Sequence, residues 1–279
     1  MAMRYEPVDC DLCGLAGEQG VPLHSRIVRC PRCRLLYVTP RPVRENLVAR
    51  QSRAYWLDEY LPAYQAVDVA SRYRPALAFL ERYRRTGQLL DIGCGLGFFL
   101  NEAKQRGWQA EGVDVSPFTR EYAAEAFGVE VHIGELHQLS LSREAYDGVT
   151  LWDTIEHVQS PSALLREVNR LLRPEGVVLL STPIWNSLSR YVLGRRFQAI
   201  GPDDHIYYFH AGTLGAMLRR AGFAPVHTGS EFLGASLANL WPLAPFIRRV
   251  LHSRPLAPIG DLALRLGLGD QLLLYARKT

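Results

Sequence analysis

The chain has 279 residues, of which 48% are hydrophobic and 22% are charged, and a formal net charge of +4. These fractions are those of a soluble globular protein, and the charge is too small to argue by itself for a nucleic-acid partner. No run of 18 or more apolar residues occurs, and no basic stretch followed by an apolar segment opens the chain, so we expect a cytoplasmic protein without a transmembrane helix.

Residues 1–42 are predicted to form a zinc-ribbon-like module. Four of the five cysteines form Cys10-x2-Cys13 and Cys30-x2-Cys33, with sixteen residues between the pairs. Each pair can present two thiolates from a tight knuckle, so that two knuckles complete a tetrahedron. Protein ligands fill all four positions, and we therefore expect a structural Zn²⁺. Disulfides are the alternative, and the poorer one in a reducing cytosol.

Arginines are numerous in and just after this module: Arg26, Arg29, Arg32, Arg34, Arg41 and Arg44. A basic zinc ribbon can bind nucleic acid. Acidic residues are interspersed, however, and aromatic platforms of the kind that bind RNA are not evident. A solvated face, or a surface that packs on a second domain, is the interpretation we favour, and we do not expect a nucleic-acid partner.

Residues 43–86 show helical patterns and many aromatic residues, which predicts a connector that caps a cofactor pocket. Most of these aromatics are expected to be core. Tyr55, Tyr60 and Tyr64 are the candidates for facing a cofactor or a substrate.

A glycine-rich turn follows, in the stretch Leu89-Leu90-Asp91-Ile92-Gly93-Cys94-Gly95-Leu96-Gly97-Phe98-Phe99-Leu100. An apolar run ends in Asp91, three glycines follow at alternate positions, and an amphipathic pattern begins. This order predicts a buried parallel strand, a tight turn and a crossover helix, with a ligand beyond the carboxyl end of the strand. The glycine spacing differs from that of a nicotinamide site, and the Gly-Lys-Ser/Thr of a phosphate-binding Walker loop is absent.

The turn resembles motif I of the class I S-adenosylmethionine (SAM) methyltransferases, D/E-x-G-x-G-x-G, at every fixed position. That resemblance implies a SAM cofactor and a Rossmann-like seven-stranded α/β sheet with helices on both faces. It assigns five residues of the turn to cofactor binding: Asp91, Gly93, Cys94, Gly95 and Gly97. For Cys94 a small side chain beside the cofactor is favoured over a nucleophile.

Later strands carry further matches in the order of the family. Asp114, at the end of the second strand with Val115 after it, matches the acid that binds both ribose hydroxyls. Glu135 and Leu136, after the third strand, match the positions that face the adenine. Trp152, at the end of the fourth strand, completes the cofactor residues that the resemblance implies.

Residues 152–158 are expected to carry chemistry. If they are helical, Asp153, Glu156 and His157 share one face. The stretch resembles the E-x-x-E-H segment of ubiquinone-pathway and small-RNA methyltransferases, in which such residues can hold a divalent cation. Asp153 stands where those families have Glu. Asp153 and His157 are therefore catalytic candidates, with an active-site cation as one hypothesis and a structural turn histidine as the other.

The segment 184–210 is too long for a plain connection and is predicted to be a lid or binding loop. It resembles the P-x-H-x-x-x-F segment of bacterial methyltransferases that act on small molecules and saccharides. His205 in this segment is the second candidate base, because methyl transfer to a hydroxyl or amine needs a proton removed. A polar loop histidine that anchors the lid is the alternative.

Strands six and seven are predicted near residues 224–230 and 271–277, with strand seven antiparallel at the edge of the sheet. Residues 232–269 between them are predicted to form a helical cap, or else an amphipathic surface for lipid or a partner. The methyltransferase domain is thus expected to span residues 87–279.

Together these features predict an enzyme: a SAM-dependent methyltransferase acting on oxygen, or else nitrogen or carbon, of a small molecule or saccharide. The chain is a homodimer candidate. One alternative is an RNA methyltransferase that grips its substrate with the zinc ribbon. Another is a SAM-binding or zinc-ribbon adaptor protein without turnover.

Overall fold

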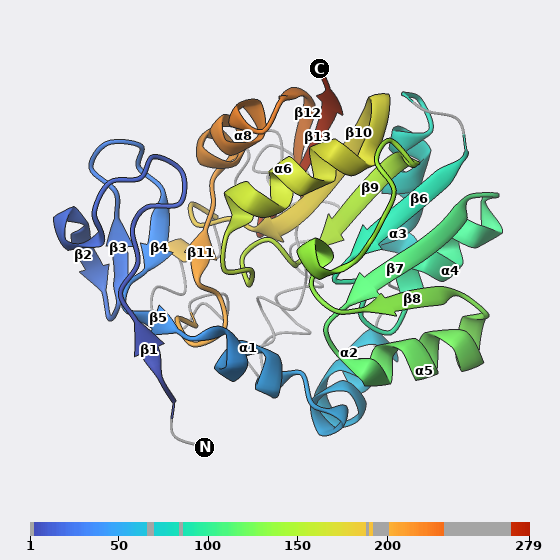
Figure 1. Cartoon of the computed structure of the whole chain (residues 1–279), viewed down its shortest axis with the longest axis horizontal. Helices are drawn as coiled ribbons and strands as arrows, with labels where there is room; N and C mark the ends of the chain where they lie inside the picture. Colours follow the sequence, from blue (N-terminus) through green and yellow to red (C-terminus); the bar gives the residue numbers. More distant parts are fainter. Residues whose placement is uncertain (1–2, 66–69, 84–85, 188–189, 192–200, 232–268) are drawn as a thin grey trace, which may run out of the picture.

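A computed structural model describes residues 3–65, 70–83, 86–187, 190–191, 201–231 and 269–279. Figure 1 shows a small β-rich module at the N-terminal end beside a large twisted sheet that has helices on both faces. The predicted α/β architecture is confirmed.

The large sheet has seven strands in the order β12-β13-β10-β9-β6-β7-β8. Its strands are β6 (Gln88–Ile92), β7 (Gln109–Asp114), β8 (Glu130–Ile133), β9 (Tyr146–Trp152), β10 (Leu172–Pro183), β12 (Phe223–Glu231) and β13 (Gln271–Lys278). Neighbours from β8 to β10 pair in parallel, and β13 pairs antiparallel with both β10 and β12. The carboxyl ends of β6, β7, β9 and β10 therefore lie along one edge.

The expectation that the seventh strand lies at the edge of the sheet is wrong. β13 is antiparallel, as predicted, but it lies between β10 and β12, and β12 is the edge strand. The burial of the two strands explains this order. From Gln271 to Ala276 the residues are almost all buried, as in a strand covered on both faces. β12 is largely half-exposed and contains Pro225, which an edge strand tolerates.

Successive residues of the strands pack in opposite directions. Leu89 of β6 packs with helices on one face, while its neighbour Leu90 packs on the other. One face is covered by α3 (Ala70–Leu80), α4 (Phe98–Gln105) and α5 (Pro117–Phe127), and the other by α6 (Pro161–Leu171) and α8 (Ala211–Arg220). This two-sided burial fixes the strand ends, and hence the loops that follow them.

The N-terminal module contains short strands and one 3-10 turn. These are β1 (Tyr5–Glu6), η1 (Gly17–Gln19), β2 (Val21–His24), β3 (Ile27–Arg29), β4 (Leu36–Val38) and β5 (Arg41–Pro42). β1 pairs with β5, whereas β2, β3 and β4 form a sheet whose fourth strand is β11 (Tyr207–Tyr208), which lies between β10 and α8 in the chain. The module is thus joined to the rest of the molecule through a shared sheet.

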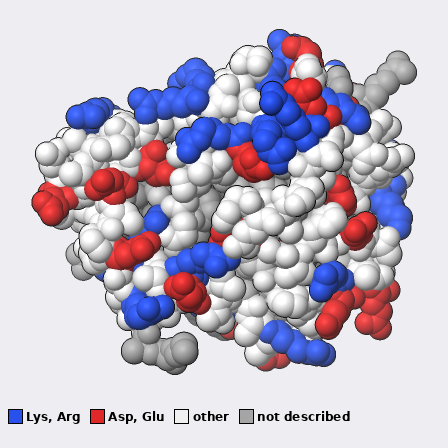
Figure 2. Space-filling view, in the orientation of Figure 1, with Lys and Arg blue, Asp and Glu red and all other residues white. Residues whose placement is uncertain are grey.

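The connector contains α1 (Arg44–Arg50), a π-helical turn η2 (Tyr55–Tyr60) and α2 (Leu61–Gln65), and η3 (Leu136–Gln138) follows β8. The predicted cap, apart from Gly269, lies outside the described residues, as does much of the predicted lid. Among the described helices, none is long and apolar enough to cross a membrane. On the face seen in Figure 2, Lys and Arg gather around α6 with Asp and Glu among them.

Candidate functional site

The glycine turn after β6 has the backbone that its sequence predicts. Gly93, Gly95 and Gly97 have φ angles of +71°, +53° and +84°, which side-chain-bearing residues rarely adopt. Space is also limited, because a Cβ on Gly93 would lie 2.3 Å from Thr154 Oγ1. The Asp91 carboxyl group is buried at the start of this turn and accepts a 2.6 Å hydrogen bond from Thr150 Oγ1. Burial raises the pKa of Asp91 to about 8, although the hydrogen bond from Thr150 acts in the opposite direction.

The Asp114 carboxylate faces the same turn from the end of β7. Its Oδ2 accepts from the Gly95 backbone N–H at 3.0 Å and its Oδ1 from the Ser116 N–H at 2.9 Å. Burial raises the pKa of Asp114 to about 6, although these backbone donors act in the opposite direction. The carboxylate is therefore fixed beside the glycines, where a diol could bind to it.

Aromatic rings from the connector cover the turn. Trp56 and Tyr60 both lie near Gly95, at 3.2 Å from the position of a Cβ. Tyr60 stacks on Tyr64, which stacks on Phe98 at the start of α4. The sequence-predicted Tyr60 and Tyr64 are thus brought to the site, and Tyr55 packs against Trp56 and Tyr60 at the rim of this cluster.

Among the residues that the structure describes, two buried indole N–H groups have no hydrogen-bond partner. They are Trp56 Nε1, above the glycine turn, and Trp152 Nε1, at the end of β9. A buried donor without a partner is costly, which makes such groups natural contacts for a ligand with many acceptors. SAM carries carboxylate and adenine acceptors for these donors, and ribose hydroxyls that can donate to the Asp114 carboxylate.

The remaining predicted cofactor residues, Cys94, Val115, Glu135 and Leu136, lie around the glycine turn and after β7 and β8. The Cys94 side chain packs at Gly112 of β7 in a hydrophobic cluster beneath α4 and α5. Val115 links Asp114 to the start of α5. Glu135 caps η3 and forms an ion pair with Arg44, while Leu136 is buried.

Arg72 of α3 is a residue of the site that sequence reasoning missed. Its Nη1 lies 2.9 Å from Asp153 Oδ2, its Nη2 donates to Ser181 Oγ at 2.5 Å, and its guanidinium lies 4.9 Å from the Trp152 ring centroid. Burial would raise the pKa of Asp153, but the Arg72 charge and hydrogen bond outweigh it and lower that pKa. The sequence did contain a signal for Arg72, because this arginine is adjacent to the aromatic residue Tyr73 in a predicted helix.

Residues 152–158 do not form the helix that would place Asp153, Glu156 and His157 on one face. Residues 155–157 make a turn, and Asp153, just before it, has a φ of +48°. Asp153 therefore faces Arg72, whereas Glu156 is fully buried and accepts from Thr182 Oγ1 at 2.9 Å. Burial raises the pKa of Glu156 to about 7, with the Asp153 charge adding to it and His157 opposing it.

The turn brings His157 to His205, which lies 48 residues further along the chain. Their rings are 4.6 Å apart between centroids. His157 Nδ1 lies 3.0 Å from the Asp204 carbonyl oxygen, and because a carbonyl only accepts, Nδ1 carries a proton and Nε2 is left for other contacts. Burial would lower the pKa of His157, but Asp204 and Glu156 outweigh it and raise the pKa to about 9.

Glu156, His157 and His205 can offer three ligand atoms that lie within 4.8 Å of one another. Carboxylate oxygen and imidazole nitrogen are ligands for divalent transition metals. The third member of this group is His205, not Asp153, which the sequence pattern had placed with Glu156 and His157. The grouping depends on two loops meeting, which no local spacing reveals.

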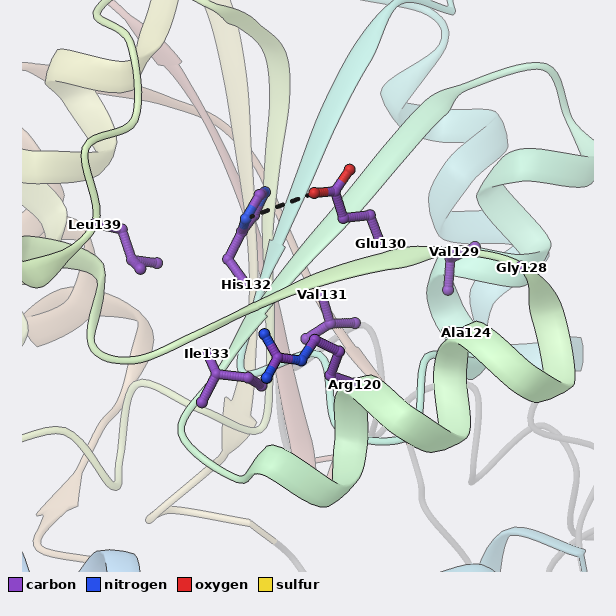
Figure 3. Close-up of a pocket in the computed structure, with 9 residues that line it drawn as sticks. All are labelled: Arg120, Ala124, Gly128, Val129, Glu130, Val131, His132, Ile133 and Leu139. Atoms are coloured by element: carbon purple, nitrogen blue, oxygen red, sulfur yellow. Dashed lines mark ion pairs between the residues drawn. The ribbon is translucent and has the colours of Figure 1, made fainter.

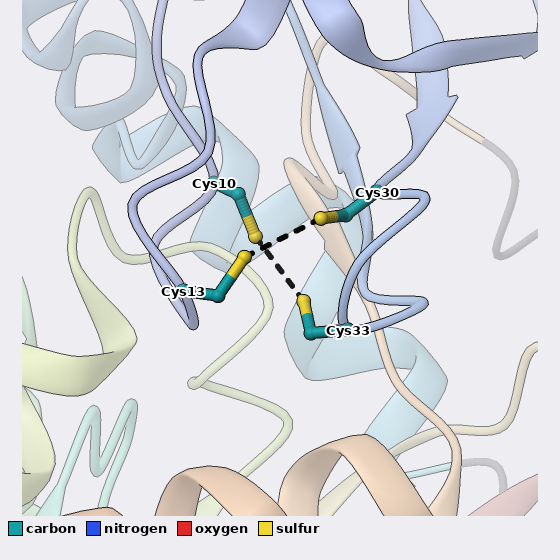
Figure 4. Close-up of side chains that lie close together, drawn as sticks. All are labelled: Cys10, Cys13, Cys30 and Cys33. Atoms are coloured by element: carbon teal, nitrogen blue, oxygen red, sulfur yellow. Dashed lines mark hydrogen bonds between the residues drawn. The ribbon is translucent and has the colours of Figure 1, made fainter.

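The four module cysteines also converge. Figure 4 shows their side chains pointing toward one another from two knuckles. The Cys10 and Cys33 sulfurs are 3.4 Å apart, and those of Cys13 and Cys30 are 3.5 Å apart. A tetrahedron of Zn–S bonds of about 2.3 Å separates its sulfurs by about 3.8 Å, so a small expansion accommodates the ion. All four are free thiols.

A separate groove of about 640 Å³ lies between α5 and β8, the strand at the edge of the sheet opposite β12. Figure 3 shows that Arg120, Glu130 and His132 line it. None of the predicted cofactor or catalytic residues lines this groove, so it is distinct from the site at the strand ends.

Comparison with known proteins adds the family. A family model described as a methyltransferase domain matches residues 64–228, more than half of the chain. The chain belongs to the class I SAM-dependent methyltransferase family. The match begins after α1 and η2 of the connector, and it covers α3, the glycine turn, the acidic strand ends and both histidines.

The relatives include O-methyltransferases. The ubiquinone biosynthesis O-methyltransferase of Pseudomonas aeruginosa is 30% identical over 153 residues, which cover 48% of this chain and 63% of that protein. The malonyl-[acyl-carrier protein] O-methyltransferase of Serratia marcescens is 30% identical over 123 residues, covering 44% and 48%. The chain thus matches less than two thirds of either relative. A solved SAM-dependent methyltransferase from Thermotoga maritima shares the fold, with a TM-score of 0.56, 19% identity, and coverage of 81% of this chain and 100% of that chain.

Proposed function

We propose that the protein transfers a methyl group from SAM to an oxygen of a small molecule or sugar-containing metabolite. One observation carries the proposal: the predicted cofactor and acceptor residues lie together at the carboxyl ends of the parallel strands. The glycine turn follows β6, Asp114 ends β7, and His157 lies in the loop after β9, where its ring meets that of His205. Ligands of open α/β sheets bind at this edge. Both curated relatives named above are O-methyltransferases, which supports oxygen as the acceptor atom.

The site residues would hold SAM in distinct ways. Asp114 would accept hydrogen bonds from the ribose hydroxyls, and the glycines leave room for close approach of the ligand to the backbone. Glu135 and Leu136 remain the predicted adenine contacts, and Trp152 and Trp56 supply indole donors. SAM itself supplies a methyl group that its positive sulfur has already activated, so the protein's task is mainly to orient the acceptor and exclude water.

His157 is the residue we assign to proton removal. Its Nδ1–H is held by the Asp204 carbonyl, so Nε2 carries the lone pair when the ring is neutral. A base within hydrogen-bond reach of the acceptor hydroxyl would take its proton as the new C–O bond forms and the bond between the SAM sulfur and the methyl group breaks, which releases S-adenosylhomocysteine. His205, whose ring lies edge-on to that of His157, would line the acceptor site beside it. Asp153 would act indirectly, through its ion pair with Arg72.

A divalent cation is a second way to activate the same hydroxyl. Glu156, His157 and His205 would supply its ligands, and the ion would lower the pKa of a bound hydroxyl. Calorimetric titration of the protein with Mn²⁺ or Zn²⁺ tests this, with Glu156→Gln and His205→Ala expected to abolish binding outside the cysteine site. Equal binding by the wild type and both variants would contradict a cation at this place.

We further propose a structural Zn²⁺ on Cys10, Cys13, Cys30 and Cys33. The support is the convergence of the four sulfurs. Against the effect of burial, hydrogen bonds from the Cys33 backbone and the Cys13 side chain lower the pKa of Cys30 to about 7, whereas burial raises the pKa of Cys10 and of Cys33. Metal analysis of the purified protein should find about one zinc per chain, as four protein ligands imply. A Cys13→Ser/Cys33→Ser variant should lose it.

The cofactor proposal is tested first by calorimetry with SAM and S-adenosylhomocysteine on protein of known zinc content. Micromolar binding of both is expected, and Asp114→Ala should abolish it. A panel of hydroxyl-bearing acceptors with labelled SAM then tests transfer. His157→Ala and His205→Ala should lose activity while keeping cofactor affinity. His132→Ala, which alters a histidine bound to Glu111 within the sheet, is the matched control.

Other outcomes would favour the alternatives. Tight, salt-dependent RNA binding in a filter assay would favour an RNA methyltransferase. Cofactor binding without turnover on any acceptor would favour a SAM-binding adaptor. A homodimer and a cytoplasmic location stay predictions, which sedimentation and cell fractionation would check.

A further inference from the structure

The two histidine loops lie between the sheet and the N-terminal zinc-ribbon-like module. His157 lies in the loop between β9 and α6, and His205 lies just before β11. The module, residues 3–42 of the described chain, contacts the end of each loop through a different part of its metal-binding scaffold.

The first knuckle holds the end of the His157 loop. Asp11, between Cys10 and Cys13, accepts from the Ser162 N–H at 2.7 Å and from the Ser160 hydroxyl at 2.7 Å. These residues begin α6, so the Asp11 carboxylate also places a negative charge at the positive end of that helix. The loop that carries His157 therefore ends on a residue fixed by the cysteine knuckle.

The second knuckle holds the end of the His205 loop. The Cys30 N–H donates to the Leu35 carbonyl, and β4 starts at the next residue. β4 pairs with β11, where Tyr37 is opposite Tyr207, and the Val38 N–H donates to the Ile206 carbonyl at 3.0 Å. His205 is therefore adjacent to a strand that belongs to the module's own sheet.

The two loops are also tied to each other at this place. The Ile206 and Tyr207 N–H groups both donate to the Glu156 carbonyl, at 2.9 and 3.1 Å. Arg41 of the module donates to the Gln159 carbonyl and lies 3.2 Å from the Tyr207 hydroxyl, so one side chain contacts both loops. The Arg41 side chain is 12% exposed.

We infer that the zinc-ribbon-like module is a positioning element of the acceptor side of the active site, with Asp11 and Arg41 as its positioning residues. They set the distance between His157 and His205 and touch none of the predicted cofactor residues. The inference rests on the proposed function for the role of the histidines. It assigns the module an internal partner in place of a nucleic acid.

Hydrogen exchange on the zinc-loaded 279-residue chain tests this. In Asp11→Ala, amides of residues 154–162 should exchange about tenfold faster or more, because the charged hydrogen bonds to the end of the His157 loop are lost. In Arg41→Ala, amides of residues 154–162 and 203–208 should both exchange faster, because Arg41 contacts both loops. Amides of the central strand β9 should keep their wild-type protection. Calorimetry with S-adenosylhomocysteine should give an affinity within about twofold of wild type, as the cofactor residues are untouched.

Two further variants control the result. Asp9→Ala removes an aspartate that also neighbours Cys10 but accepts from the Gly17 N–H inside the module and, within the described part of the chain, from neither loop, so it should leave both loops unchanged. Asp11→Asn keeps an acceptor oxygen and should restore most of the protection. Zinc content should be equal in all four variants.

The inference is overturned if both loops keep wild-type exchange in Asp11→Ala and Arg41→Ala, or if exchange rises equally in β9. The second result would make the module a general stabiliser of the fold. Failure of the wild type to bind S-adenosylhomocysteine would instead count against the proposed function, and the exchange result would still decide the role of the module.

Discussion

Arg72 is a buried charge whose partners are defined, so the cost of removing it can be worked out. Its side chain is 11% exposed, and it forms ion pairs with Asp153 at 2.9 Å and Glu231 at 3.5 Å. Removing one partner of a buried ion pair costs about 3–5 kcal/mol, because the remaining charge is left uncompensated, and the lower end, about 3 kcal/mol, applies here because Asp153 and Glu231 keep 33% and 24% exposure to solvent. Arg72→Met keeps an apolar stem of similar length, and we expect it to lower the free energy of unfolding by that amount at pH 7.

Arg74 offers a matched control on the same helix. It is also paired with a glutamate, Glu102 at 3.1 Å, but its side chain is 57% exposed. Exposed pairs contribute about 0–1 kcal/mol, so Arg74→Met should be nearly neutral. Urea unfolding followed by tryptophan fluorescence and circular dichroism measures both variants, because the slope of the transition reports whether the denatured state has changed.

Acid should reduce the difference between wild type and Arg72→Met. Arg72 lowers the pKa of Asp153 in the folded protein, so the pair stabilises the fold above the unfolded-state pKa of Asp153 and that contribution is lost as pH falls through the folded-state pKa. In an Asp153→Asn background, where the amide carries no charge, Arg72→Met should also cost less, by about 0.5–3 kcal/mol. Equal costs for Arg72→Met and Arg74→Met, or an unchanged cost of Arg72→Met in the Asp153→Asn background, would refute the reasoning.

Three further predictions follow from the site. Methyl transfer should increase with pH up to about 9, because His157 acts as a base only when deprotonated and its pKa is raised to about 9; a profile already flat at pH 7 would contradict this assignment. The affinity for S-adenosylhomocysteine, measured by calorimetry, should fall as pH drops through about 6, since Asp114 then gains a proton, and Asp114→Asn should remove that dependence. Gly93→Ala should destabilise the protein by about 2–5 kcal/mol, from its left-handed backbone and the contact with Thr154. Adding Thr154→Ala should recover part of this loss in urea unfolding, and no recovery would show that the contact is unimportant.

Local sequence patterns determined the elements of the site. The glycine turn after Asp91 was predictable because positive φ angles and a strand-to-helix transition depend on adjacent residues. The two Cys-x2-Cys knuckles were predictable for the same reason, since each presents two thiolates from one turn. The strand ending in Asp114 follows from an apolar run that stops at an acid. These features need only the residues next to them in the chain.

Only the tertiary structure decided which of these elements meet. Arg72 reaches Asp153 across 81 residues, and His205 joins Glu156 and His157 because two loops converge. Tyr207 and Tyr208 become the fourth strand of a sheet that begins near the N-terminus. Such contacts form between segments far apart in sequence, so they depend on how the sheet and helices pack, which no local periodicity encodes. The placement of β13 depends on both the local sequence and the tertiary structure. Its continuous apolar run indicates an interior strand, but only the folded structure shows that its neighbours are β10 and β12.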